Sequence, residues 1–270
     1  MNKISLGWLI LCAISSLCGA ETIDVVLLAG QSNMAGNAPL ADVPAEFKQP
    51  PQQVVLQSSG KSEIIGSRAS FGPEIGFSKA ISAARPKQQV LLVKHAKGGT
   101  SLAGWAPKWE KEKLASKYDA SAGPLYRTLL DQYQAAIAGK KVRLTAILWM
   151  QGESDSRYPA LGPHYYDNLK TLIEAFRRDL KDPNLPFLMG HVNTPADMLD
   201  DDKKSTKFRF ISNVRAAQEK AVKEIPNVYL IETDDLSKQK DRIHYDAKGQ
   251  LELGKRFAEV WLKQIPDLTK

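Results

Sequence analysis

The feature that most constrains the fold is a short, unbroken apolar run at residues 25–29, which ends abruptly at Gly30. A strand with one face in water alternates apolar and polar residues, and this run shows no such alternation. It therefore predicts a strand, at about 23–29, that is buried on both faces, as in the parallel sheet of an α/β protein. Further strands are predicted at residues 54–57, 90–94, 144–150, 187–190 and 228–231.

Amphipathic segments separate these predicted strands. Gly72 and Pro73 open the first helix at Glu74, and residues 123–124 open a second that runs to about Ala138. Because crossover helices join parallel strands, this alternation predicts a doubly wound α/β sheet. The chain has no repeat, low-complexity tract or linker, so we expect one domain over residues 21–270. Three more helices are predicted at residues 164–180, 208–223 and 247–264.

The first twenty residues have the pattern of a secretory signal peptide. Lys3 supplies a positive start, residues 6–17 are mostly apolar, and small residues precede a cleavage site after Ala20. A retained N-terminal anchor is the alternative. Both cysteines, Cys12 and Cys18, lie in this segment, so the mature chain has no disulfide or thiol nucleophile. We expect a secreted or periplasmic protein with no stable membrane insertion after cleavage.

The net charge of +7 is spread along the chain. The lysines are scattered, and no arginine-rich tract with interleaved aromatic residues is present. This distribution is typical of solvated surface, so we expect no nucleic-acid partner and no obligate protein partner. Weak attraction to anionic glycans is compatible with it.

Polar loops follow several of the predicted strands and predict a catalytic site. The carboxyl ends of parallel strands share one edge of the sheet, where α/β proteins bind ligands. Ser32 follows the first strand and is the predicted nucleophile. His244 is the predicted base, and Asp241, three residues earlier, can orient its ring through a hydrogen bond. A solvated Asp and His on a surface loop is the alternative for this pair.

The tetrahedral intermediate of acyl transfer needs hydrogen-bond donors at its oxyanion. The backbone N–H groups of Ser32 and Gly98 and the side-chain amide of Gln151 are the predicted oxyanion-hole donors. An ordinary turn at Gly98 and a loop-capping hydrogen bond at Gln151 are the alternatives.

Residues beside these donors are predicted to support the loops that carry them. They are Gln31, Gly99 and Glu153, and Glu153 and Asp155 are also alternative partners for His244. Trp105, Trp109 and Tyr158 lie near the site loops, so they are candidates for stacking on a sugar or for packing in the core.

No motif for a metal or a cofactor is present. The histidines lack the spacing of metal ligands, and no glycine-rich phosphate loop opens a helix after a strand. We therefore expect neither a metal nor a cofactor.

Four motifs resemble, in order, the conserved blocks of SGNH-type hydrolases. They are residues 30–34 (GQSNM), 98–101 (GGTS), 149–155 (WMQGESD) and 241–244 (DRIH). The match is to the sialate O-acetylesterase-like domain, which includes the acetylxylan esterases of carbohydrate esterase family six.

The resemblance implies a single-domain, three-layer α/β/α sandwich, flavodoxin-like, with a mainly parallel sheet of about five strands. It also implies hydrolysis of acetyl esters on carbohydrates, with the roles given above for Ser32, Gly98, Gln151, Asp241 and His244. In one respect the chain departs from the wider superfamily, since Gln151 occupies a position where that superfamily has Asn. The extra methylene changes the reach of the amide.

The sequence thus predicts a serine esterase acting on an acetylated carbohydrate, such as acetylated xylan or an O-acetyl sialic acid. Two rivals remain. One is an esterase or thioesterase for other acyl groups, although no apolar lid is evident. The other is a catalytically silent glycan-binding module. The loops expected to set specificity, 37–70 and 192–207, carry no recognisable code.

Overall fold

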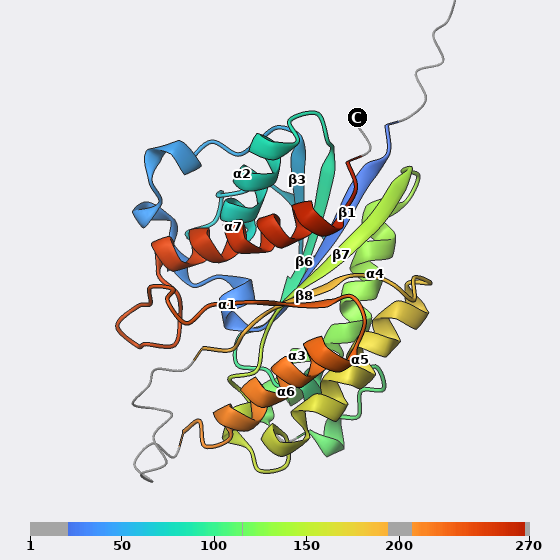
Figure 1. The fold of residues 1–270 in the computed structure, drawn as a ribbon, viewed down its shortest axis with the longest axis vertical. Helices are drawn as coiled ribbons and strands as arrows, with labels where there is room; N and C mark the ends of the chain where they lie inside the picture. The colour runs from blue at the N-terminus through green and yellow to red at the C-terminus, as the bar shows by residue number, and fades with distance from the viewer. Residues whose placement is uncertain (1–20, 115, 194–206, 268–270) are drawn as a thin grey trace, which may run out of the picture.

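The computed structural model describes residues 21–114, 116–193 and 207–267, which form an α/β/α sandwich around one large sheet (Figure 1). The sheet has seven strands in the order β4-β3-β6-β1-β7-β8-β9, and all neighbours pair in parallel except β4, which is antiparallel to β3. A separate two-stranded sheet pairs β2 with β5. The strands are β1 (Ile23–Gly30), β2 (Ala38–Pro39), β3 (Val54–Ser58), β4 (Lys61–Glu63), β5 (Ser70–Phe71), β6 (Val90–Ala96), β7 (Val142–Met150), β8 (Phe187–Gly190) and β9 (Val228–Ile231).

Helices connect the strands. The α-helices are α1 (Ser32–Ala35), α2 (Glu74–Ala84), α3 (Lys117–Ala122), α4 (Leu125–Ile137), α5 (Tyr165–Asp179), α6 (Ile211–Glu224) and α7 (Ala247–Gln264). Short 3-10 helices are η1 (Leu40–Asp42), η2 (Ala45–Phe47), η3 (Leu102–Trp105), η4 (Lys111–Lys113), η5 (Asp155–Arg157) and η6 (Gly162–His164). None of the described helices combines the length and the apolar character needed to cross a bilayer.

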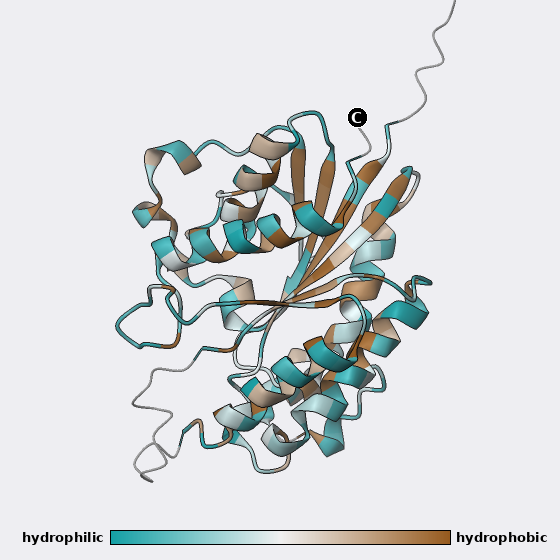
Figure 2. Ribbon diagram, in the orientation of Figure 1, coloured by the Kyte–Doolittle hydropathy of each residue, from teal (hydrophilic) through white to brown (hydrophobic). Residues whose placement is uncertain are grey.

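Each face of the sheet has its own apolar core. Helices α2 and α7 cover one face, and α4, α5 and α6 cover the other (Figure 1). On β1, Val25 and Leu27 pack toward α4, α5 and α6, whereas Val26 and Leu28 pack toward α2 and α7. Successive side chains of a strand point to opposite faces, so a sheet covered on both sides requires an unbroken apolar run. Figure 2 shows the result, with apolar strands inside and polar helix surfaces outside.

The predicted fold class is confirmed, and each predicted strand and helix has its counterpart. The sheet is wider than the about five strands expected, partly because β4 (Lys61–Glu63) extends one edge with a sequence too polar to be recognised as a strand. Helix α6 begins at Ile211 rather than at residue 208, and α1 and α3 were not predicted. The predicted signal peptide, residues 1–20, and most of the 192–207 loop lie outside the described residues.

The topology places the end of β1 at the natural ligand position of the sheet. The chain leaves β1 toward β3 and β6 on one side and later crosses to β7, β8 and β9 on the other. The connections therefore diverge at the carboxyl end of β1, where open α/β sheets bind ligands. Gly30 ends this strand with φ of +143°, and a Cβ there would lie 2.1 Å from the carbonyl oxygen of Met150. Only glycine lets β1 end this close to β7.

Candidate active site

Ser32 is held at the end of β1 by backbone contacts on both sides. The N–H of Gln31 donates to the carbonyl of Met150 at 2.9 Å, and the N–H of Lys97 donates to the carbonyl of Gly30 at 3.1 Å. Ser32 then begins the single turn of α1, and Gly36 closes that turn with a hydrogen bond to the Ser32 carbonyl at 2.8 Å. The serine is therefore fixed between the ends of β6 and β7.

Asp241 and His244 form a compact turn before α7. Nδ1 of His244 lies 2.6 Å from Oδ2 of Asp241, and Oδ1 of Asp241 accepts the backbone N–H groups of Ile243 and His244, both at 2.9 Å. Arg242 lies between them with φ of +63°, a left-handed conformation that folds the turn back on itself. The carboxylate therefore orients the imidazole and closes the loop that carries it.

The charge of Asp241 is favoured by this geometry. Partial burial on its own raises the pKa of a carboxyl group, but the hydrogen bonds from the His244 backbone, the His244 ring and the Ile243 backbone outweigh it. The pKa of Asp241 is consequently lowered from its usual value. The group remains a carboxylate wherever His244 acts as a base.

Asn33 joins the serine turn to the histidine turn. Its Nδ2 donates to the carbonyl of Ile243 at 3.2 Å, and its Oδ1 accepts the N–H of Tyr245 at 3.1 Å. The residues on both sides of His244 are thus fastened to the residue that follows Ser32. Asn33 was not predicted as a site residue, although it lies inside the GQSNM motif.

The glycine loop after β6 contacts the predicted nucleophile. A Cβ built on Gly98 would lie 3.6 Å from the Cβ of Ser32, so the two residues are neighbours. Within the described parts of the chain, the backbone N–H groups of Ser32 and Gly98 have no hydrogen-bond partner. Two unpaired donors beside a serine hydroxyl are what an oxyanion hole requires.

The side-chain amide of Gln151 differs from its predicted role. The residue is fully buried, and its Nε2 donates to the carbonyl of Thr100 at 3.1 Å, to Oε1 of Gln31 at 3.3 Å and to Asp155. Its Oε1 accepts the hydroxyl of Tyr165 at 3.0 Å. An amide has two hydrogens, and these partners use both. Gln151 therefore ties the loops together beneath the site instead of donating into it.

Two buried acids hold the glycine loop in place. Asp119 accepts the N–H and the hydroxyl of Ser101, each at 2.7 Å, and Asp155 accepts the N–H of Leu102 at 3.1 Å through either oxygen. Burial raises the pKa of Asp155 to about 7, against the opposing hydrogen bonds from Gln151 and Leu102. Asp155 is therefore bonded to the glycine loop rather than to His244.

Glu153 supports the serine turn from the same segment. Its Oε1 accepts Nδ2 of Asn33 at 2.9 Å, while Oε2 is buried without a hydrogen-bond partner in the described chain. Burial raises the pKa of Glu153 above its usual value, although hydrogen bonds from its own backbone and from Asn33 oppose this. Gln31 has a similar supporting position, because its Oε1 also accepts the N–H of Ser154 at 3.3 Å.

The aromatic residue that borders the site is not one of those expected. Trp105 is fully buried, with its ring against His95 and Trp149 at centroid distances of 6.0 and 5.2 Å, so it is a core residue. Tyr118, by contrast, is 45% exposed, and its ring lies 3.5 Å from the position of a Cβ on Gly99. It comes from the unpredicted helix α3 in a lysine-rich stretch that gave no functional signal. Trp109 and Tyr158 are partly buried.

The sandwich and its rim of polar loops define the class: a three-layer α/β/α protein whose polar loops gather at the carboxyl ends of the parallel strands. The chain belongs to the family described as carbohydrate esterase, sialic acid-specific acetylesterase, whose model matches residues 22–263. It is therefore a carboxylic ester hydrolase of a carbohydrate acetylesterase family.

Individual relatives are distant in sequence but similar in fold. A probable carbohydrate esterase of Arabidopsis thaliana is 24% identical over 202 residues, a match that covers 74% of this chain and 66% of that protein, just under two thirds. Its crystal structure has a TM-score of 0.72, 22% identity and coverage of 91% of this chain and 100% of that one. A carbohydrate acetylesterase from Xanthomonas citri has a TM-score of 0.65, 20% identity and coverage of 87% and 55%. At these identities the structural likeness shows a shared fold.

Proposed function

We propose that the protein is a serine esterase that removes O-acetyl groups from a carbohydrate through an acetyl-enzyme intermediate. The main support is that Asn33, the residue after Ser32, forms hydrogen bonds to the residues on both sides of His244. His244 in turn contacts Asp241. An alcohol, an imidazole and a carboxylate from opposite ends of the chain thereby share one rim. This is the set of groups that activates a serine.

In the proposed reaction the hydroxyl oxygen of Ser32 attacks the acetyl carbonyl carbon while His244 accepts the hydroxyl proton. The N–H groups of Ser32 and Gly98 stabilise the oxyanion. The bond to the sugar oxygen then breaks, and that oxygen takes the proton from His244. Water next attacks the acetyl-serine with His244 as base, which releases acetate and returns the proton to Ser32.

The substrate proposed is a sugar acetyl ester, either on xylan or on a sialic acid. The family description supports sialic acid esters, and the exposed ring of Tyr118 beside the glycine loop offers an apolar face for a sugar ring. Acetate release from acetylated xylan, O-acetyl sialic acid and a longer-chain ester distinguishes these substrates. Preference for the longer acyl chain would contradict an acetylesterase.

The decisive variant is Ser32→Ala. We expect it to lower the kcat for p-nitrophenyl acetate by about 10³-fold or more, because removing one member of a catalytic triad leaves only binding and the oxyanion hole. The circular dichroism spectrum and melting temperature serve as controls for folding. Activity within tenfold of the wild type in a folded variant would contradict the assignment of the nucleophile.

We also propose that residues 1–20 are a secretory signal peptide and that the mature enzyme is secreted or periplasmic. The support is the basic start, the apolar centre and the small residues up to Ala20. N-terminal sequencing of the exported protein tests this, and a mature chain that retains residues 1–20 would contradict it.

A further inference from the structure

His191, at the end of β8, is a buried histidine whose ring makes no hydrogen bond to any described residue. Its side chain is 4% exposed, and neither ring nitrogen has a hydrogen-bond partner in the described part of the chain. Its backbone is fixed, since its N–H donates to the carbonyl of Ile231 at 2.9 Å. Buried polar atoms almost always have a partner, so two unpaired nitrogens on one rigid residue indicate a missing ligand.

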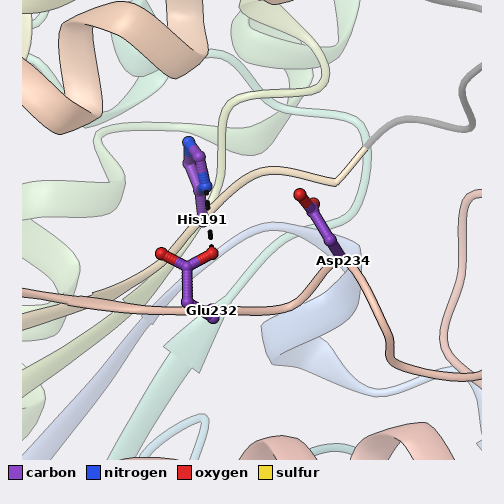
Figure 3. A group of neighbouring side chains, drawn as sticks. All are labelled: His191, Glu232 and Asp234. Atoms are coloured by element: carbon purple, nitrogen blue, oxygen red, sulfur yellow. Dashed lines mark ion pairs between the residues drawn. The ribbon is translucent and has the colours of Figure 1, made fainter.

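Carboxylates surround this imidazole on both sides. Oε2 of Glu232 lies 3.7 Å from Nδ1, as Figure 3 shows, and Oε1 of Glu219 lies 3.5 Å from Nε2. Asp234 completes the group, because a ring nitrogen of His191 and one carboxylate oxygen each of Glu232 and Asp234 all lie within 4.8 Å of one another. The three acids come from α6 and from the loop after β9.

We propose that His191, Glu232 and Asp234 bind a divalent transition-metal ion of the zinc type. Zinc takes imidazole nitrogen and carboxylate oxygen at about 2.0–2.2 Å, which places ligand atoms about 3.5 Å apart in a tetrahedral site. In the structure the ligand atoms of the three residues lie within 4.8 Å of one another, so they must move closer together to bind an ion. The side chains of Glu232 and Asp234 are 70% and 59% exposed. Glu232 can therefore move toward an ion, and Asp234 can do so by giving up one of its two hydrogen bonds to Arg215.

The other ring nitrogen supports this assignment. A histidine that binds a metal through one nitrogen donates the N–H of the other to a carboxylate or carbonyl, which fixes its tautomer. Glu219 lies at Nε2 and can accept that N–H, while Glu232 lies at Nδ1. Burial, with Arg215 nearby, lowers the pKa of His191, although Glu232, Asp234 and Glu219 oppose this. The lowering favours the neutral ring, which is the form that ligates a metal.

Two cations oppose the binding of an ion here: Arg215, and Lys238, which interacts electrostatically with Asp234. Arg215 holds Asp234 through both carboxylate oxygens at 2.9 Å and also donates to the carbonyl of Val192 at 2.7 Å. When one carboxylate oxygen of Asp234 binds the metal, the other oxygen keeps its hydrogen bond to Arg215. Arg215 then orients the ligand without contacting the metal. The three acids, Glu219, Glu232 and Asp234, outnumber these two cations, so the group retains excess negative charge for a divalent ion.

Calorimetric titration with zinc chloride tests the site, using chelator-treated protein without a histidine tag. We expect saturable binding of one zinc ion per chain, and a melting temperature raised by about 5–10 °C at zinc concentrations about 100-fold above Kd. Calcium, which prefers oxygen ligands, should bind at least about tenfold more weakly. The readouts are independent of esterase activity, so they hold whether or not Ser32 is the nucleophile.

Two variants and a control locate the ion. His191→Asn and Glu232→Gln should each weaken zinc binding by at least about tenfold, whereas Glu174→Gln, which changes an exposed carboxylate on α5, should leave it unchanged. Glu232 is exposed, so its variant decides the question even if His191→Asn does not fold. Absence of saturable zinc binding, equal affinity for calcium, or full binding by Glu232→Gln would overturn the proposal.

Discussion

At the scale of single residues, the structure distinguishes among the three acids that the sequence offered to His244, of which Asp155 is bonded to Gln151 and Leu102. Asp241 contacts Nδ1 of His244 at 2.6 Å, whereas Glu153 bonds to Asn33. The Asp-x-x-His spacing sufficed to predict the first contact, because both groups lie on one short turn. The position of Glu153 depends on tertiary packing between β7 and α1, which no local spacing reveals.

Asp241→Asn should lower the kcat for p-nitrophenyl acetate by about 10²- to 10⁴-fold, because an amide neither fixes the required tautomer nor stabilises the imidazolium. Glu153→Gln should lower it by less than about tenfold, since the amide oxygen still accepts from Asn33. Steady-state kinetics with a check of melting temperature makes the comparison. The reverse order of effects would assign Glu153 as the partner of His244.

Tyr118→Ala should raise KM for an acetylated oligosaccharide by about 2- to 12-fold, because an aromatic contact is worth about 0.5–1.5 kcal/mol. It should leave kcat/KM for p-nitrophenyl acetate within about twofold, since this small ester has no sugar ring. Tyr158→Ala, which alters a partly buried tyrosine elsewhere on the rim, is the control. Equal loss on both substrates would contradict a role in sugar binding.

At the scale of elements, the loops after β6 and β7 are joined by buried polar contacts rather than by apolar packing. Asp155 is central, because it accepts from both Gln151 and Leu102. In the folded state burial raises the pKa of Asp155 to about 7. The folded protein thus holds a proton, between about pH 4 and pH 7, that the unfolded chain has released. Its contribution to stability is present below this window and is lost as the pH rises through it.

We therefore expect the difference in unfolding free energy between the wild type and Asp155→Asn to fall on the order of 3 kcal/mol from pH 4.5 to pH 7.5. Urea denaturation across this range measures it. Asp131→Asn, an exposed carboxylate on α4, is the control and should track the wild type. Parallel stability curves for the wild type and Asp155→Asn would show that the buried carboxyl does not titrate in this window.

At the scale of the whole molecule, the sequence was sufficient for the architecture. Short, unbroken apolar runs rich in β-branched residues, such as residues 25–29, favour strands covered on both faces, and their alternation with amphipathic helices predicts the parallel sheet. The hairpin strand β4 escaped prediction because edge strands are short and polar. The cluster at His191 was not predicted because its proposed ligands lie some forty residues apart in the sequence and meet only through the pairing of β8 with β9.

The connection between Asn33 and Tyr245 spans 212 residues of chain. The hydroxyl and the imidazole therefore have no reason to meet until the final helix has docked against β1 and its neighbours. A C-terminally shortened chain that lacks the Asp241–His244 turn should be inert toward esters. If the proposed roles of Ser32 and His244 hold, ester turnover reports that the first strand and the last turn of the chain have come together.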